Sequence, residues 1–343
     1  MPGVPRGLDL AALTRWLDVH HPRLRDGDLR AELIAGGRSN LTYRLDDDTH
    51  RWVLRRPPLG HVLATAHDMS REFRVIGALH GGAVPVPEPL LLCADDSPLD
   101  APFYVMERVD GLVLRTSEQL MSVPETARGP LAERLVDTLA ALHSVDPGAV
   151  GLGDFGRPDG FLTRQVSRWG KQLAASRSRE VAGIDELHAA LAAAVPAAQR
   201  ATVVHGDFRL DNLLVRPERW DVAAVLDWEM ATLGDPLTDL GLLLVYWGDE
   251  STPALGSITD MPAAVRGFPS GGELAQRYAA SAGLDLTALP WYVAFGCFKL
   301  AVILEGIHYR YTQGQTVGAG FDQIGAVVPG LVSTGRLALE ETP

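Results

Sequence analysis

Three oxygen-bearing side chains in the second half of the chain are spaced as a metal-binding and proton-accepting set would be. Asp207 follows an apolar run, Asn212 comes five positions later, and Asp227 ends a second apolar run after a short turn. Hard cations such as Mg²⁺ take oxygen ligands and keep several waters, so one carboxylate, one amide and substrate phosphates suffice. The other carboxylate is then free to accept a proton from a hydroxyl nucleophile. We expect the intervening turn to bring all three groups to one cleft edge.

This division of labour is that of kinases, in which a catalytic-loop Asp handles the hydroxyl proton while an Asn and a later Asp bind metal. The segments HGDFRLDN and VLDWEMATLGDPLTDLG resemble the aminoglycoside phosphotransferase family, which are protein-kinase-like small-molecule kinases. The segments GGRSNLTYRL, VLRRPP, REFRVIGALH and FYVMERVDG are similar to a subgroup related to the phosphotransferase domains fused to acyl-CoA dehydrogenases. The resemblance covers roughly residues 34–246.

The resemblance implies a role for each polar residue of the first segment. It implies that Asp207 is the catalytic base and that Asn212 and Asp227 are ligands of Mg²⁺. Arg209 either orients phosphate or substrate, or is merely solvated. His205 is expected to fix the loop rather than to transfer a proton.

The second segment contains a further pair of acidic residues with two interpretations. Asp239 resembles the family's Asp at a helix start, which braces the catalytic loop. N-capping of the same helix by Asp235 is an equally good interpretation.

The first 170 residues contain no lysine, although a kinase of this sort grips the α- and β-phosphates with a Lys on its third strand. Arg55 and Arg56 are the candidates to replace it. Because side chains alternate along a strand, Val53 and Arg55 share one face, as the small apolar residue and the lysine of the kinase pattern do. We therefore expect Arg55 to hold phosphate, which arginine can do bidentately. Its expected partner is Glu72 on the following helix, unless that residue is simply an exposed Glu.

A glycine-bearing turn and a hinge segment are expected to complete the ATP site. Glycine permits close backbone approach, so backbone N–H groups and a serine hydroxyl of the turn could donate to phosphate oxygens. An ordinary hairpin loop is the alternative for this turn. The hinge would present backbone groups to adenine. The predicted nucleotide-binding residues are Gly36, Gly37, Ser39, Asn40, Val53, Arg55, Glu72, Glu107 and Val109.

Hydrophobic periodicity predicts the helices and strands that position these groups. The resemblance implies that they form an α+β, protein-kinase-like bilobal fold. A small antiparallel-sheet N-lobe would occupy residues 1–106, a hinge 107–111, and a larger mostly helical C-lobe 112–343. In the N-lobe we expect helices at 8–19 and 70–80 and strands at 29–34, 41–45, 52–55, 90–93 and 103–106. In the C-lobe we expect helices at 131–143, 161–176, 184–194 and from 237 onward, with extended chain at 203–215 and 222–228.

Composition narrows the protein class. With 343 residues, 46% hydrophobic and 22% charged, the chain suits a two-domain globular protein, and a net charge of −12 argues against a nucleic-acid partner. No signal-peptide pattern is seen, and Pro290 and Lys299 interrupt the apolar stretch at 286–305, so we expect a core helix and no membrane partner. Cys93 and Cys297 are expected to be buried free thiols, and the location cytoplasmic.

The function expected from these observations is transfer of the γ-phosphoryl of ATP to a hydroxyl of a small molecule, with ATP and Mg²⁺ as cofactors. The subgroup likeness favours a hydroxylated acyl metabolite as the acceptor. The alternatives are an aminoglycoside-antibiotic phosphotransferase and a nucleotide-binding pseudokinase scaffold. Residues 161–176 and 291–311 are expected to build the acceptor pocket, although their aromatic residues would mainly fill the core. The oligomeric state stays open.

Overall fold

The computed structural model describes residues 7–34, 40–59, 68–248, 255, 259–315 and 321–341. It divides into two units, one made of residues 1–110 with 224–229, the other of residues 111–223 and 230–343. The sequence suggested a single division at 107–111. It gave no sign that a short segment from the second half of the chain belongs to the first unit.

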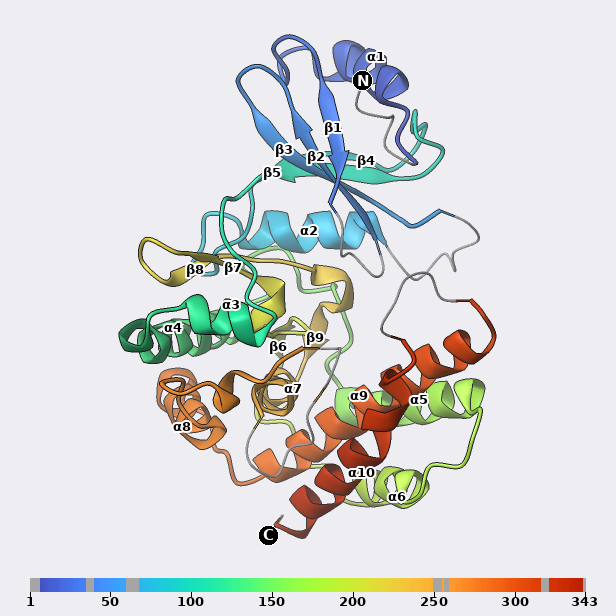
Figure 1. The fold of residues 1–343 in the computed structure, drawn as a ribbon, viewed down its shortest axis with the longest axis vertical. Coiled ribbons are helices and arrows are strands. Elements are labelled where there is room, and N and C mark those ends of the chain that lie inside the picture. Colours follow the sequence, from blue (N-terminus) through green and yellow to red (C-terminus); the bar gives the residue numbers. More distant parts are fainter. Residues whose placement is uncertain are drawn as a thin grey trace. The chain divides into compact units, whose positions relative to one another are not determined.

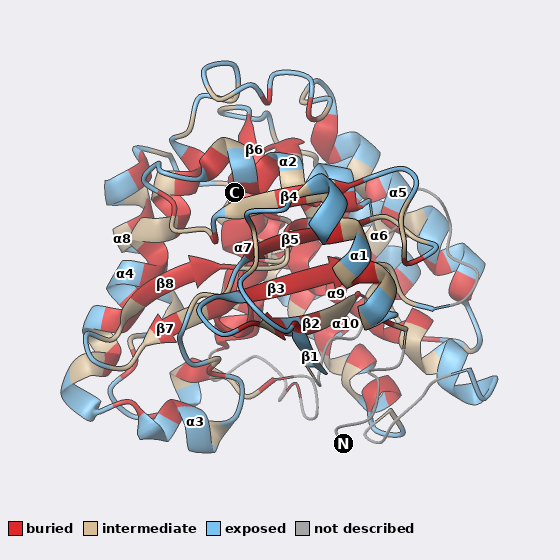
Figure 2. Cartoon of the chain, turned by 90° about the horizontal axis from the view of Figure 1, so that it is seen from above, coloured by how far each residue is buried: buried red, intermediate tan, exposed pale blue. Residues whose placement is uncertain are grey.

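The first unit is built on a five-stranded antiparallel sheet with strand order β1-β2-β3-β5-β4 (Figure 1). Its strands are β1 (Arg30–Leu33), β2 (Leu41–Asp46), β3 (Arg51–Arg56), β4 (Pro89–Cys93) and β5 (Phe103–Glu107). All five predicted strands are confirmed. Figure 2 shows β3 and β5 as buried strands, whereas β1 at the edge is largely exposed.

Alternation along the central strands gives this sheet two different faces. One face packs Leu54 and Phe103 against Leu13 of helix α1 (Leu10–His20) in an apolar core. The other face carries Val53 and Arg55, and helix α2 (Met69–Leu79) packs against this side through β4 and β5. The charged residue that the sequence singled out is therefore held away from the apolar core.

The second unit is mostly helical, as predicted. Its helices are α3 (Ser117–Ser122), α4 (Glu125–His143), α5 (Phe161–Ser176), α6 (Ile184–Ala193), α7 (Leu237–Trp247), α8 (Gly271–Ala282), α9 (Leu289–Thr312) and α10 (Ile324–Glu340). Helix α9 packs against α5, α6, α7 and α10 (Figure 1). Its length and apolar composition would allow a membrane span, but 78% of its apolar window is buried inside the structure, as in a core helix.

Short strands and 3₁₀ turns interrupt the helices. Strand β6 (Thr202–Val204) pairs with β9 (Thr232–Gly234), and β7 (Leu213–Arg216) pairs with β8 (Asp221–Val225). The extended segment predicted at 222–228 is confirmed in β8, and the turn η2 (Trp228–Met230) begins at its end. The segment predicted at 203–215 is extended at both ends and is interrupted by the turn η1 (Leu210–Asn212). A third turn, η3, covers Pro262–Ala264. The sequence also missed α3 and β9, which are too short to show a period.

Candidate active site

Arg55 of β3 meets two carboxylates in the first unit. Its Nε lies 3.4 Å from Glu72 Oε2, and its Nη2 donates to Asp227 Oδ1 at 2.9 Å. The predicted pairing of Arg55 with Glu72 is thus confirmed. Arg56 points to the other face, where it donates to the backbone carbonyl oxygens of Gly7 and Leu99. The two arginines therefore lie on opposite faces, as strand alternation predicts, and Arg55 is the one on the Glu72 face.

Glu72 is held by more than its arginine. It is 1% exposed, accepts a hydrogen bond from the Tyr104 hydroxyl at 2.9 Å, and accepts another from Asn40 Nδ2 at 2.9 Å. Burial raises the pKa of Glu72, while Arg55 and the two hydrogen bonds oppose the rise. Asn40 also donates to Glu229 Oε2 at 3.2 Å, so it joins two carboxylates. Sequence reasoning missed Tyr104 and Glu229, although Tyr104 shares the strand parity of the Arg55 face.

Asp227 is presented by an unusual backbone conformation. It follows β8 and has a φ of 66°, in the left-handed region that Asp tolerates better than most residues. The segment is fixed to the first unit by the Val225 N–H, which donates to the Pro85 carbonyl at 2.8 Å. In the part of the chain that is described, Arg55 is the donor to Asp227 Oδ1, and no donor reaches Oδ2. Asp227 therefore keeps one carboxylate oxygen available.

The remaining nucleotide-binding predictions fall in two groups. Gly36, Gly37 and Ser39 lie outside the described residues, so their predicted role stays a prediction. At the predicted hinge, the Glu107 N–H donates to Glu88 O at 2.8 Å, so this N–H group already has an acceptor within the chain. Over the described ranges, no backbone hydrogen bond involves Val109, so this residue offers its N–H and C=O groups.

In the second unit, Asp207 and Asn212 are brought into direct contact. The turn η1 folds the chain back, so that Asn212 Nδ2 donates to the Asp207 backbone carbonyl at 2.8 Å and to its Oδ2 at 2.9 Å. In this orientation, no donor among the described residues forms a hydrogen bond with Asn212 Oδ1. His205 Nδ1 accepts from the Asp207 N–H at 3.2 Å, in agreement with the loop-fixing role predicted for this histidine.

Asp239 braces the loop that carries Asp207. Its two carboxylate oxygens accept from the His205 N–H at 2.6 Å and the Gly206 N–H at 2.8 Å. Burial raises the pKa of Asp239, but His143 and the backbone donors outweigh burial and lower it. The bracing interpretation of Asp239 is thus borne out, whereas N-capping by Asp235 is not. The N-cap of α7 is Pro236, and Asp235, one residue earlier, accepts from the Leu237 N–H at 2.9 Å. His143 was missed because it lies 96 positions before Asp239.

Arg209 lies between two carboxylates of the same loop. Its Nε is 3.5 Å from Asp207 Oδ2, its Nη1 is 3.4 Å from Asp211 Oδ2, and its guanidinium stacks on Tyr246 with 4.6 Å to the ring centroid. Burial raises the pKa of Asp211, against the charge of Arg209 and the hydrogen bond from the Thr259 hydroxyl. Arg209 is therefore engaged with the loop rather than solvated.

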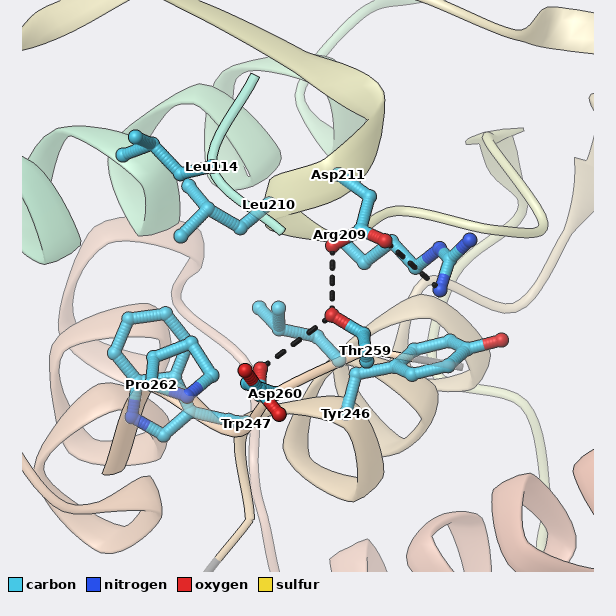
Figure 3. A pocket seen from close by; sticks show the side chains of 10 residues that line it. Leu114, Arg209, Leu210, Asp211, Tyr246, Trp247, Thr259, Asp260 and Pro262 are labelled. Carbon is cyan, nitrogen blue, oxygen red and sulfur yellow. Dashed lines mark hydrogen bonds and ion pairs between the residues drawn. The ribbon is translucent and has the colours of Figure 1, made fainter. Parts of the chain in front are cut away.

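Figure 3 shows the pocket beside this arginine. Asp211 points to Thr259 and Arg209, and Tyr246 lies below them. The space inside, about 10 Å³, suffices for about one water molecule.

The aromatic residues expected to fill the core do so with one exception. Trp169, Trp291, Tyr292 and Phe295 are buried, whereas Tyr309 is 37% exposed. Both cysteines are buried and neither forms a disulfide, as predicted. Among the described residues there is no cluster of three or more His, Cys, Asp or Glu side chains that could hold a metal ion.

Sequence comparison places the chain among phosphotransferases. Residues 30–274 match the family described as the phosphotransferase enzyme family, APH. The chain is 37% identical over 291 residues, 84% of its length, to acyl-CoA dehydrogenase family member 10 of Mus musculus. It is also 37% identical over 314 residues, 89% of its length, to family member 11 of Rattus norvegicus. The chain spans 27% and 40% of the lengths of these two relatives.

Solved structures agree with this assignment. A candidate aminoglycoside phosphotransferase from Ralstonia eutropha superposes with a TM-score of 0.83 and 32% identity, over 98% of this chain and 99% of that one. Aminoglycoside phosphotransferase APH(4)-Ia, in a ternary complex with AMP-PNP and hygromycin B, shares the fold with a TM-score of 0.62 and 14% identity, over 96% and 98% of the two chains. The chain therefore belongs to the APH phosphotransferase enzyme family and has its kinase-like fold.

Proposed function

We propose that this protein transfers the γ-phosphoryl group of ATP to a hydroxyl of a small molecule, with Mg²⁺ as the metal cofactor. The observation that carries the proposal is the contact of Asp207 with Asn212 on a loop braced by Asp239. A carboxylate held this firmly can accept a hydroxyl proton at a fixed position, which is the contribution that phosphoryl transfer asks of a protein base.

The proposal takes one magnesium ligand from each unit, and the chemistry of each suits the ion. Asp227 and Asn212 each keep one oxygen that no described donor occupies, and Asn212 does so because its amide nitrogen is committed to Asp207. A carboxylate and an amide oxygen, completed by phosphates and water, suit a hard cation. When bound, the ion would neutralise charge on the phosphates. Asp227 and Asn212 are the residues that would hold it.

The other residues act on the phosphates and the base. Arg55 carries a permanent charge, fixed by Glu72, for the α- and β-phosphates. Arg209 and Asn212 both hold the Asp207 carboxylate, and both do so at Oδ2. Val53 is buried on the Arg55 face, where the proposal has it pack on adenine. Relatives of the same fold were solved with AMP-PNP or with GDP, so both purine nucleotides should be assayed.

A hydroxylated acyl metabolite is our proposed acceptor class, and an aminoglycoside is the second candidate. The first is supported by 37% identity to proteins named as acyl-CoA dehydrogenase family members. The second is supported by solved relatives that bind hygromycin B or kanamycin.

Charge favours the first candidate. Carboxylates around the Asp207 loop already have donors from within the second unit, Asp211 from Arg115 and Thr259, and Asp235 from Tyr292. They are therefore poorly placed to bind the ammonium groups of an aminoglycoside.

A γ-labelled ATP assay over a panel of hydroxyl compounds tests the proposal. The panel should contain hydroxylated acids and thioesters, aminoglycosides and neutral alcohols, each with and without Mg²⁺. We expect labelled phosphate on at least one small-molecule hydroxyl, in a metal-dependent reaction. ATP binding without transfer to any acceptor would instead support the pseudokinase scaffold.

A further inference from the structure

Lys299 of α9 is a buried cation directly behind the catalytic loop. It is 8% exposed, and its Nζ donates to the Gly206 carbonyl at 2.5 Å, one residue before Asp207. An ammonium group has three N–H donors. Within the described part of the second unit, no other acceptor receives a hydrogen bond from Lys299 and no carboxylate forms an ion pair with it. Two of its three donors are therefore uncommitted.

A buried charge without a contacting counter-charge is costly. Burial lowers the pKa of Lys299, and the more distant charges of Asp207 and Asp239 oppose this. Both carboxylates already have close donors of their own, from Asn212 and from the loop backbone. The free donors of Lys299 are therefore open to a group that the chain does not supply.

Trp169 of α5 adds a second uncommitted donor at the same place. The Lys299 Nζ lies 5.6 Å from the centroid of this indole ring, and the Arg168 guanidinium carbon lies 5.8 Å from it. Trp169 is 8% exposed, and its Nε1–H finds no acceptor among the residues described. An indole N–H can only donate, and buried N–H groups are rarely left unpaired. Two cations and an unpaired donor thus lie at one ring, and no carboxylate of the described residues forms an ion pair with either cation.

We infer that Lys299, Trp169 and Arg168 form an oxyanion subsite beside Asp207. The subsite would take a carboxylate or phosphate oxygen, because such an anion accepts from both free donor types and offsets the buried charge. This inference rests on the proposed function. The anion has two sources, a negatively charged group on the acceptor or the phosphoryl group in transit to it. A polycationic acceptor would meet repulsion here.

A phosphate titration tests the subsite without knowledge of the acceptor. The full chain is first saturated with Mg²⁺ and AMP-PNP, so that free phosphate cannot occupy the nucleotide positions, and inorganic phosphate is then titrated at constant ionic strength. We expect Lys299→Met to weaken phosphate binding about tenfold or more, and Trp169→Phe, which keeps the ring and removes only the donor, to weaken it severalfold. Lys171→Met, an exposed lysine of α5, serves as the matched control and should bind as the wild type does.

If Lys299→Met does not fold, Trp169→Phe decides the test by itself. Phosphate binding by both variants with the wild-type dissociation constant would overturn the inference. A lack of saturable phosphate binding in every protein, the wild type included, would also overturn the inference.

Transfer kinetics then separate the two sources of the anion. A hydroxy acid and its amide are compared as acceptors. If the acceptor supplies the anion, the wild type prefers the acid and Lys299→Met loses that preference. If the phosphoryl group supplies it, Lys299→Met lowers kcat equally for both acceptors and leaves their KM unchanged. Wild-type kcat and KM in this variant would contradict the subsite. No transfer to any acceptor by the wild type would count against the proposed function, while the phosphate titration still decides the subsite.

Discussion

Replacement of Arg55 tests whether this arginine is the structural centre of the first unit's charged cluster. Its guanidinium reaches Glu72 through Nε and Asp227 through Nη2, and its side chain is 11% exposed. Lysine has a single nitrogen and can keep one of these two contacts in good geometry. Loss of one charged hydrogen bond costs about 1.5–3 kcal/mol, so Arg55→Lys should lower the free energy of unfolding by that amount. Arg55→Met leaves a buried carboxylate without its cation and should cost about 3–5 kcal/mol.

Urea unfolding followed by circular dichroism measures these losses, with Arg51→Met as the matched control. Arg51 lies on the same strand and pairs with Asp110 at 2.7 Å, but the two side chains are 53% and 63% exposed. An exposed pair is worth at most about 1 kcal/mol, so this variant should unfold almost as the wild type does. Equal losses for Arg55→Met and Arg51→Met would refute the view that Arg55 neutralises a buried carboxylate.

Three further predictions concern single positions. Burial opposes ionisation of Asp47, but three backbone N–H donors outweigh it and hold the pKa of this carboxyl well below its ordinary value. A carboxyl with a depressed pKa stabilises the fold at pH values above its ordinary pKa, and this stabilisation is lost as the pH falls. Asp47→Asn should therefore lower the free energy of unfolding by about 1–3 kcal/mol at neutral pH and by progressively less below about pH 4. Urea unfolding at both pH values measures the difference. Gly206 has a φ of 84°, and an added Cβ would lie 2.7 Å from Met230 O. Gly206→Ala should therefore unfold at a lower urea concentration and transfer phosphate more than about tenfold more slowly. Wild-type behaviour of this variant would show that the loop backbone can shift. Asp239→Asn replaces one of the two accepting carboxylate oxygens by an N–H donor that faces a loop N–H. We expect kcat to fall at least about tenfold with little change in KM for ATP. A change in KM alone would contradict the bracing role.

Local patterns predicted the strands and most helices because their apolar periodicity is regular. Strand alternation also separated Arg55 from Arg56, since adjacent residues point to opposite faces. The contact of Asp207 with Asn212 followed from a spacing of five residues. The 3₁₀ character of the turn between them was not predicted, because three residues of 3₁₀ helix leave no periodic signal.

Contacts between distant parts of the chain could not be predicted in the same way. His143 and Asp239 are 96 positions apart, and Lys299 and Gly206 are 93 apart, so no local pattern links them. His143 lies in α4 and Lys299 in α9, both among buried apolar residues, so the sequence gives no sign of their polar contacts. Tyr104 is a typical strand residue by its sequence context, and its hydrogen bond to Glu72 becomes apparent only in the folded structure.

The central claim is that Asp207 serves as the base for phosphoryl transfer, and comparison of the wild type with Asp207→Asn tests it most directly. Once an acceptor is found, ³¹P NMR follows the formation of its phosphate monoester, and a titration with AMP-PNP measures nucleotide binding. We predict that Asp207→Asn forms the monoester about 10²- to 10⁴-fold more slowly and binds the nucleotide as tightly as the wild type. Equal rates of monoester formation in the two proteins would contradict the assignment.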